Sequence, residues 1–148
     1  MPAQAPTKKF FSLEEAVALL PFVRATFAEA HKAMLPLRDE VILYKRLQQS
    51  REEEALDYDD PDLVAINQIL EEKISAYEDL FRLWIGKLTD KGIQVKQFEK
   101  GLVDFPYRSA DTGEEYLLCW HLKDDGLFYF HGPNEGFAGR KPITLLPE

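Results

Sequence analysis

The sequence predicts an α+β protein in which a long antiparallel helical hairpin precedes a small antiparallel β-meander of three to four strands. Two observations predict this class. Up to Gly92, apolar residues recur every three or four positions, as they do along one face of a helix. After Gly92, they fall in short segments rich in β-branched and aromatic residues. We therefore divide a single domain, residues 1–148, into an N-terminal extension (1–11), a helical hairpin (12–91) and a meander with its tail (92–148).

The first helix is predicted to begin at Ser12. Ser12 and Glu15 form a capping box, in which each side chain accepts a hydrogen bond from the other residue's backbone N–H. An apolar stripe then continues to about Gln49. Pro21 and Pro36 interrupt it, because proline lacks the amide donor and clashes with the preceding turn. We expect a break near Pro21 and a kink at Pro36.

An acidic connection, residues 50–60, follows the first helix. Asp57, Asp59 and Asp62 are closely spaced oxygen donors, which is a pattern that can bind calcium. An EF-hand loop that starts at Asp57 requires Gly at its sixth position and Glu at its twelfth, whereas this chain has Asp62 and Gln68 there. We therefore interpret the acidic segment as a solvated connection.

The second helix is predicted to begin at Asp60-Pro61, an N-cap residue followed by proline at the first helical position. It ends at Lys91-Gly92, a cationic last turn followed by glycine. Beside its main stripe runs a second apolar row, which consists of Ala65, Ile69, Ala76, Leu80 and Leu83. The sheet can cover part of this row, and a second copy of the hairpin can cover the rest. We therefore predict a homodimer through the helical hairpin, as a four-helix arrangement.

The predicted strands are short and are separated by turns that contain glycine. They span residues 93–98, 102–107, 115–122 and 127–131. The tail from Gly132 onward is rich in glycine and proline, which favours a surface loop. We expect this tail to pack back on the protein through Phe137 and Ile143.

Composition excludes several classes of function. The 148 residues include 18 Lys plus Arg and 26 Asp plus Glu, a net charge of −8, which argues against nucleic acid and anionic membranes as partners. With 45% hydrophobic residues the chain can bury a core. Its single cysteine, Cys119, cannot form an internal disulfide, and no signal peptide or membrane-spanning segment is visible. We expect a soluble cytoplasmic protein.

Five segments resemble a bacterial protein family, the domain-of-unknown-function family 2203. They are FSLEEAVALLP near the N-terminus, GLVDFP (101–106), YLLCWHL (116–122), FYFHG (128–132) and GFAGRKPI (136–143). Together they cover nearly the whole chain. The resemblance implies a bacterial protein and no established activity, substrate or cofactor.

Charged residues inside the predicted sheet are the candidate site residues. Asp104 interrupts an apolar strand, and a buried acid requires a partner. Arg140 or Arg108 can offer a bidentate fork, which would tie the tail to the sheet as a structural clasp. Alternatively, these charges orient a small polar ligand in a pocket with Trp120 as a stacking surface and His131 beside it. The candidate ligand-binding residues are Asp104, Arg108, Trp120, His131 and Arg140.

Thiol and metal chemistry find less support in the sequence. Cys119 and His121 share a strand face, but residues two apart on a strand lie nearly 7 Å apart, and a cysteine there is commonly a small buried hydrophobe. A zinc or iron site from His121, His131 and an acid such as Asp104 or Glu135 is conceivable. Because no ligand spacing typical of a helix or turn supports it, we expect no metal, no cofactor and no catalytic residue.

Two classes of function remain. We expect a non-enzymatic, homodimeric binding or scaffold protein, whose polar sheet face or acidic hairpin tip contacts a protein partner. The alternative is a small-molecule-binding protein or an enzyme with its site around Asp104, Trp120, His131 and Arg140. An enzyme requires a concave site with convergent polar groups, and a scaffold requires an exposed apolar or charged surface.

Overall fold

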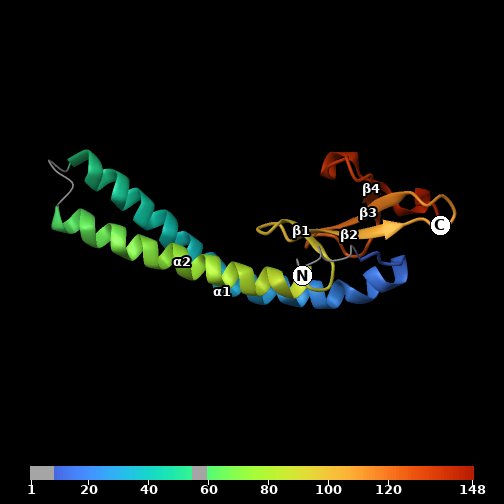
Figure 1. Cartoon of the computed structure of the whole chain (residues 1–148), viewed down its shortest axis with the longest axis horizontal. Coiled ribbons are helices and arrows are strands. Elements are labelled where there is room, and N and C mark those ends of the chain that lie inside the picture. The colour runs from blue at the N-terminus through green and yellow to red at the C-terminus, as the bar shows by residue number, and fades with distance from the viewer. Residues whose placement is uncertain (1–8, 55–59) are drawn as a thin grey trace, which may run out of the picture. The chain divides into compact units, whose positions relative to one another are not determined.

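The computed structural model describes residues 9–54 and 60–148. Two helices, α1 (Leu13–Glu54) and α2 (Pro61–Thr89), lie side by side as a hairpin in Figure 1. Five strands follow: β1 (Gln94–Gln97), β2 (Leu102–Arg108), β3 (Glu115–Trp120), β4 (Tyr129–His131) and β5 (Lys141–Pro142). Two short 3-10 helices, Phe137–Gly139 and Ile143–Leu145, flank β5. The predicted α+β class is confirmed, with one strand more than the expected maximum because part of the tail pairs with β4.

The capping box at the start of α1 is confirmed. The Ser12 N–H donates to Glu15 Oε1 at 3.1 Å, and the Glu15 N–H donates to Ser12 Oγ at 3.0 Å. The break expected near Pro21 is wrong, because α1 is one continuous helix from Leu13 to Glu54. The carbonyl that Pro21 leaves without a helical partner belongs to Val17, and this residue is 47% exposed, so this turn of α1 faces solvent.

The predicted start of α2 is also confirmed. The Asp62 N–H donates to Asp60 Oδ1 at 2.9 Å, and Pro61 is the first helical residue. Arg51, near the end of α1, forms an ion pair with Asp60 at 2.7 Å and thereby joins the two helices at the closed end of the hairpin. Asp57 and Asp59, which suggested calcium, lie outside the described residues.

The contacts divide the chain into two compact units. The sheet unit consists of the described residues up to Phe27 together with Ile85–Glu148, and the hairpin unit consists of Ala28–Trp84. In the hairpin unit, the helices are joined by buried apolar residues and by polar contacts between α1 and α2, which include Gln48–Asn67 at 2.8 Å and Glu40–Lys73 at 2.5 Å. The second apolar row of α2 is not buried there: Ala65, Ala76 and Leu83 are exposed, and Ile69 and Leu80 are half-buried.

The sheet has the order β1-β2-β3-β4-β5 with antiparallel neighbours, which is a simple meander. Its core face carries the apolar side chains Val103, Phe105, Leu118, Trp120 and Phe130, all at most 3% exposed. Within the sheet unit, Phe11 packs edge-to-face on Phe105, with ring centroids 5.4 Å apart. The opposite face, here called the polar face, carries Asp104, Cys119 and His131. The alternation of side chains along β2 and β3 thus separates the core from the candidate site.

Candidate functional site

The polar face holds a buried cluster of three side chains. Asp104 of β2 is the register partner of Cys119 of β3, so both project from the same face. His131 of β4 pairs with Leu117, two residues before Cys119, and therefore lies diagonally across from the thiol. The exposed fractions are 2% for Asp104, 1% for Cys119 and 4% for His131. Three neighbouring strands thus bring a carboxylate, a thiol and an imidazole together out of contact with solvent.

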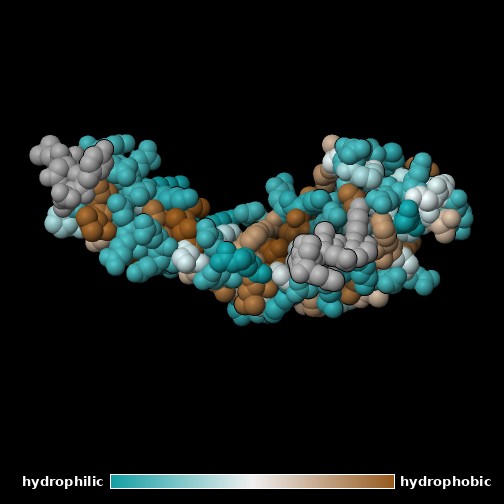
Figure 2. Space-filling view, in the orientation of Figure 1, coloured by the Kyte–Doolittle hydropathy of each residue, from teal (hydrophilic) through white to brown (hydrophobic). Residues whose placement is uncertain are grey.

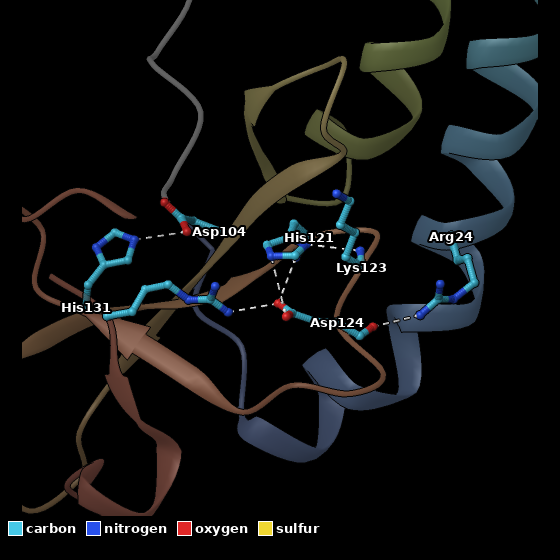
Figure 3. Close-up of polar contacts among 7 residues, drawn as sticks. Arg24, Asp104, His121, Lys123, Asp124 and His131 are labelled. Atoms are coloured by element: carbon cyan, nitrogen blue, oxygen red, sulfur yellow. Dashed lines mark hydrogen bonds and ion pairs between the residues drawn. The ribbon is translucent and has the colours of Figure 1, made fainter. Parts of the chain in front are cut away.

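A hydrogen bond joins two members of this cluster, and the third lies beside them. His131 Nε2 lies 3.1 Å from Asp104 Oδ1, and Nδ1 of the same ring lies 2.8 Å from the Gly132 carbonyl oxygen. Figure 3 shows the Asp104 and His131 side chains pointing toward each other. The Cys119 thiol lies beside the Asp104 carboxylate, because the two residues are register partners on β3 and β2. Burial, together with the negative charge of Asp104, raises the pKa of the Cys119 thiol to about 12, so the sulfur is held as a thiol.

Asp124, in the loop between β3 and β4, connects this loop to two distant segments of the sheet unit. Its Oδ2 accepts hydrogen bonds from the His121 N–H at 3.2 Å and from Arg140 Nη2 at 2.8 Å. Its backbone carbonyl accepts a hydrogen bond from Arg24 Nη2 of α1 at 3.0 Å. Figure 3 shows Asp124 between His121 and Arg24. The loop is therefore held both by the tail and by the first part of α1.

Arg140 ties the tail to the polar face through an ion pair and two cation–π contacts of its guanidinium group. Besides the ion pair with Asp124, the group stacks on the rings of Tyr129 at 4.0 Å and Phe137 at 4.5 Å. The side chains of Arg140 and Asp124 are only 12% and 13% exposed, so solvent screens this ion pair weakly. The stacking also fixes Phe137, which forms a wall of the neighbouring cavity.

A cavity of about 470 Å³ opens beside the ends of β2 and β3. It is lined by Gln97, Glu99, Lys100, Leu102, His121, Lys123 and Phe137. His121 Nδ1 accepts a hydrogen bond from the Lys123 backbone N–H at 3.0 Å, and this contact holds the imidazole in place. The lining thus combines two ammonium groups and an imidazole with one carboxylate, in a protein whose overall charge is −8.

The structure separates some of the residues that the sequence grouped. Asp104 and His131 are together, but Arg140 pairs with Asp124 instead of Asp104. Arg108 contacts the Gly113 carbonyl at 3.3 Å. Trp120 is the register partner of Val103 on the core face, where Arg24 lies over its ring at 5.1 Å. The proposed clasp between Asp104 and Arg140 is therefore replaced by two separate pairs.

Sequence reasoning missed the roles of Asp124 and Cys119. Asp124 stands in an Asp-Asp-Gly turn, where acids commonly bond local backbone groups, and nothing in that turn indicates a partner sixteen residues away. The spacing along the chain pairs Cys119 with His121, two residues away on the same strand. The cross-strand register Asp104–Cys119 is the signal that links it to the cluster, and it follows from aligning 102–107 with 115–122 across their connecting turn.

The fold and the cluster define an α+β protein with a helical hairpin, a five-stranded antiparallel meander and a buried Asp–Cys–His group on one sheet face. The chain belongs to the family described as uncharacterized conserved protein (DUF2203), which matches residues 9–143. The resemblance noted in the sequence is thus confirmed. No curated protein and no solved structure matches the chain. Among the described residues, neither helix has a long enough apolar stretch to cross a bilayer.

Proposed function

We propose that the protein is a non-enzymatic binding protein that holds a small anionic ligand with an apolar body in the cavity beside β2 and β3. The observation that carries this proposal is the lining of the 470 Å³ cavity, which places Lys100, Lys123 and His121 around the apolar surfaces of Leu102 and Phe137. Pockets of this size commonly combine an apolar wall with a few charged groups that orient the ligand. The ammonium groups would pair with a carboxylate or phosphate, and Phe137 would stack on the apolar body.

A binding role without chemistry is favoured by the state of the neighbouring thiol. Cys119 is the only cysteine of the chain, and its raised pKa keeps it protonated and therefore a poor nucleophile. His121, in the cavity, accepts a backbone hydrogen bond through Nδ1 and lies next to Asp124. Its ring is thus held by the loop and has no hydroxyl or thiol partner among the described contacts that it could activate as a base.

Calorimetric titration with benzoate and phenyl phosphate tests this function. We expect one of these probes to bind with a stoichiometry of one per chain, and both Lys123→Met and Phe137→Ala to weaken binding at least tenfold. Lys96→Met is the matched control, because Lys96 is an exposed lysine of β1 outside the cavity lining. Binding that is lost equally in the Lys96 variant would indicate a general charge effect. No binding of either probe to the unmodified chain would refute the proposal.

We also propose that two copies of the chain associate through their hairpin units. Figure 2 shows apolar side chains on the surface of the helical hairpin. On α2, Val64 and Leu83 are 51% and 56% exposed, and on α1, Leu43 and Leu47 are 52% and 42% exposed. The second copy is the favoured partner because the α2 row keeps the three- and four-residue spacing with which helices pack on each other.

Light scattering at micromolar concentration tests this association. We expect a dimeric mass for the unmodified chain and a monomeric mass for Leu83→Glu, which places a charge within the apolar row. Ser75→Glu is the control, because it adds the same charge at an exposed polar position of α2. A monomeric mass for the unmodified chain would refute the association.

We propose the bacterial cytoplasm as the location of the protein. The single cysteine is buried and free, and a free thiol persists in a reducing compartment. Cell fractionation with an antibody against the chain tests this location, and recovery in an extracytoplasmic fraction would contradict it.

A further inference from the structure

We infer that Asp104, Cys119 and His131 form a binding site for one zinc ion. The three side chains offer an oxygen, a sulfur and a nitrogen ligand, and these atoms all lie within 4.8 Å of one another. Zinc binds this combination of donors, whereas calcium and magnesium prefer oxygen ligands alone. The inference is independent of the cavity and of the ligand proposed for it.

The positions of the three ligand atoms fit a tetrahedral ion. With metal–ligand distances of about 2.0 to 2.3 Å, two ligand atoms on a tetrahedral zinc lie about 3.3 to 3.7 Å apart. Asp104 Oδ1 and His131 Nε2 are already 3.1 Å apart, and the sulfur lies within 4.8 Å of both. An ion between them therefore requires only small side-chain movements. Each ligand comes from a different strand of one sheet, so the backbone keeps the three positions fixed.

The hydrogen bonding of His131 is that of a metal ligand. A neutral imidazole carries one N–H, yet both ring nitrogens of His131 face acceptors, the Gly132 carbonyl on Nδ1 and the Asp104 carboxylate on Nε2. When Nδ1–H donates to Gly132, the contact at Nε2 requires either a second proton or a cation. Metal-binding histidines commonly donate one N–H to a backbone carbonyl, which orients the ring and leaves the other nitrogen for the metal.

The charge of the cluster also suits a zinc ion in a buried place. One Zn²⁺ with the Asp104 carboxylate, the Cys119 thiolate and a neutral His131 has a net charge of zero. A bound zinc ion would therefore leave no uncompensated charge inside the protein.

The cluster contains no fourth histidine, cysteine or acidic ligand among the described residues. A three-ligand zinc site keeps its remaining position for water or a small anion. This position distinguishes the proposed site from a closed structural zinc site with four protein ligands.

Metal titration of the full-length chain tests the inference. The chain is stripped with a chelator and titrated with Zn²⁺ in competition with an indicator, and with Co²⁺ as a spectroscopic probe. We expect one ion per chain, a rise in Tm with zinc and a sulfur-to-cobalt charge-transfer band. Absence of both the charge-transfer band and the Tm rise in the unmodified chain would overturn the inference.

Variants locate the bound ion. Cys119→Ser preserves the size of the side chain and should remove the charge-transfer band. His131→Gln should weaken zinc binding more than about 100-fold, which exceeds the loss expected when a residue only orients a metal ligand. The matched control is His121→Gln, because His121 belongs to the adjacent cavity and is absent from the cluster. Circular dichroism confirms that each variant folds. Equal loss in the His121 and His131 variants would place the metal elsewhere and overturn the assignment.

Discussion

Replacing Arg140 by Met should destabilise the sheet unit by about 3 kcal/mol. The change removes a hydrogen bond between charged groups, which contributes about 1.5 to 3 kcal/mol, and the stacking on two rings, which contributes about 0.5 to 1 kcal/mol each. Met retains the apolar stem, so the loss comes from the guanidinium. Asp124→Asn should cost about 2 kcal/mol, because the amide oxygen can still accept from the His121 N–H while the negative charge is lost.

Urea denaturation of the two single variants and the double variant measures the coupling between Asp124 and Arg140. Because the two side chains touch, we expect a coupling energy of about 1 to 2 kcal/mol. Lys141→Met is the matched control: its ion pair with Glu135 joins side chains that are 52% and 41% exposed, and such pairs contribute less than about 1 kcal/mol. Additive effects at Asp124 and Arg140, within about 0.5 kcal/mol, would refute the view that this ion pair holds the tail.

Three further predictions concern the backbone and one phenol. Gly101→Ala should lower the free energy of unfolding in urea by more than about 2 kcal/mol, because Gly101 has a φ of +59° and a β-carbon there meets the Leu122 side chain. Gly113→Ala should lower it by only about 1 kcal/mol, because Gly113 has a φ of +72° but open space around it. Pro21→Ala should raise stability by about 1 to 3 kcal/mol by restoring a helical N–H at an exposed position, and an unchanged urea midpoint would contradict this. Burial and nearby acids raise the pKa of Tyr107 above 10.0, so the folded state keeps this proton to higher pH than the unfolded chain does. The free energy of unfolding should therefore fall as pH rises above about 10, and it should fall less in Tyr107→Phe. The same pH dependence of unfolding free energy in both proteins would contradict the prediction.

Local signals in the sequence predicted the helices well. The capping box at Ser12 and the Asp60-Pro61 start depend on residues within one turn of each other, and both have the predicted geometry. The break at Pro21 was wrong because the cost of proline depends on whether the carbonyl without a partner can reach water, and exposure is not visible in a single local pattern. The helix also continues to Glu54 instead of ending near Gln49.

The sheet and the site were predicted less completely. The strand β5 is only two residues long, and it forms because the tail returns to pair with β4. Two residues are too few to show the alternation of apolar and polar side chains that predicts a strand. The need of Asp104 for a partner was predicted correctly, but the partner is His131 instead of an arginine. That choice depends on the registers of β2 with β3 and of β3 with β4, which determine the positions of side chains distant in sequence.

The division of the chain into two units means that the length of the helical hairpin can change without changing the sheet unit. The hairpin unit, Ala28–Trp84, is inserted between the two segments of the sheet unit, so the chain leaves that unit at Phe27 and returns at Ile85. The buried cluster, the cavity and the Arg140 contacts all belong to residues outside the insertion. Matched deletions of one heptad from each helical arm therefore change the reach of the hairpin without removing any residue of the site. The length of the helical arms and the residues of the candidate site are therefore separable, and each can change during evolution or in design while the other is retained.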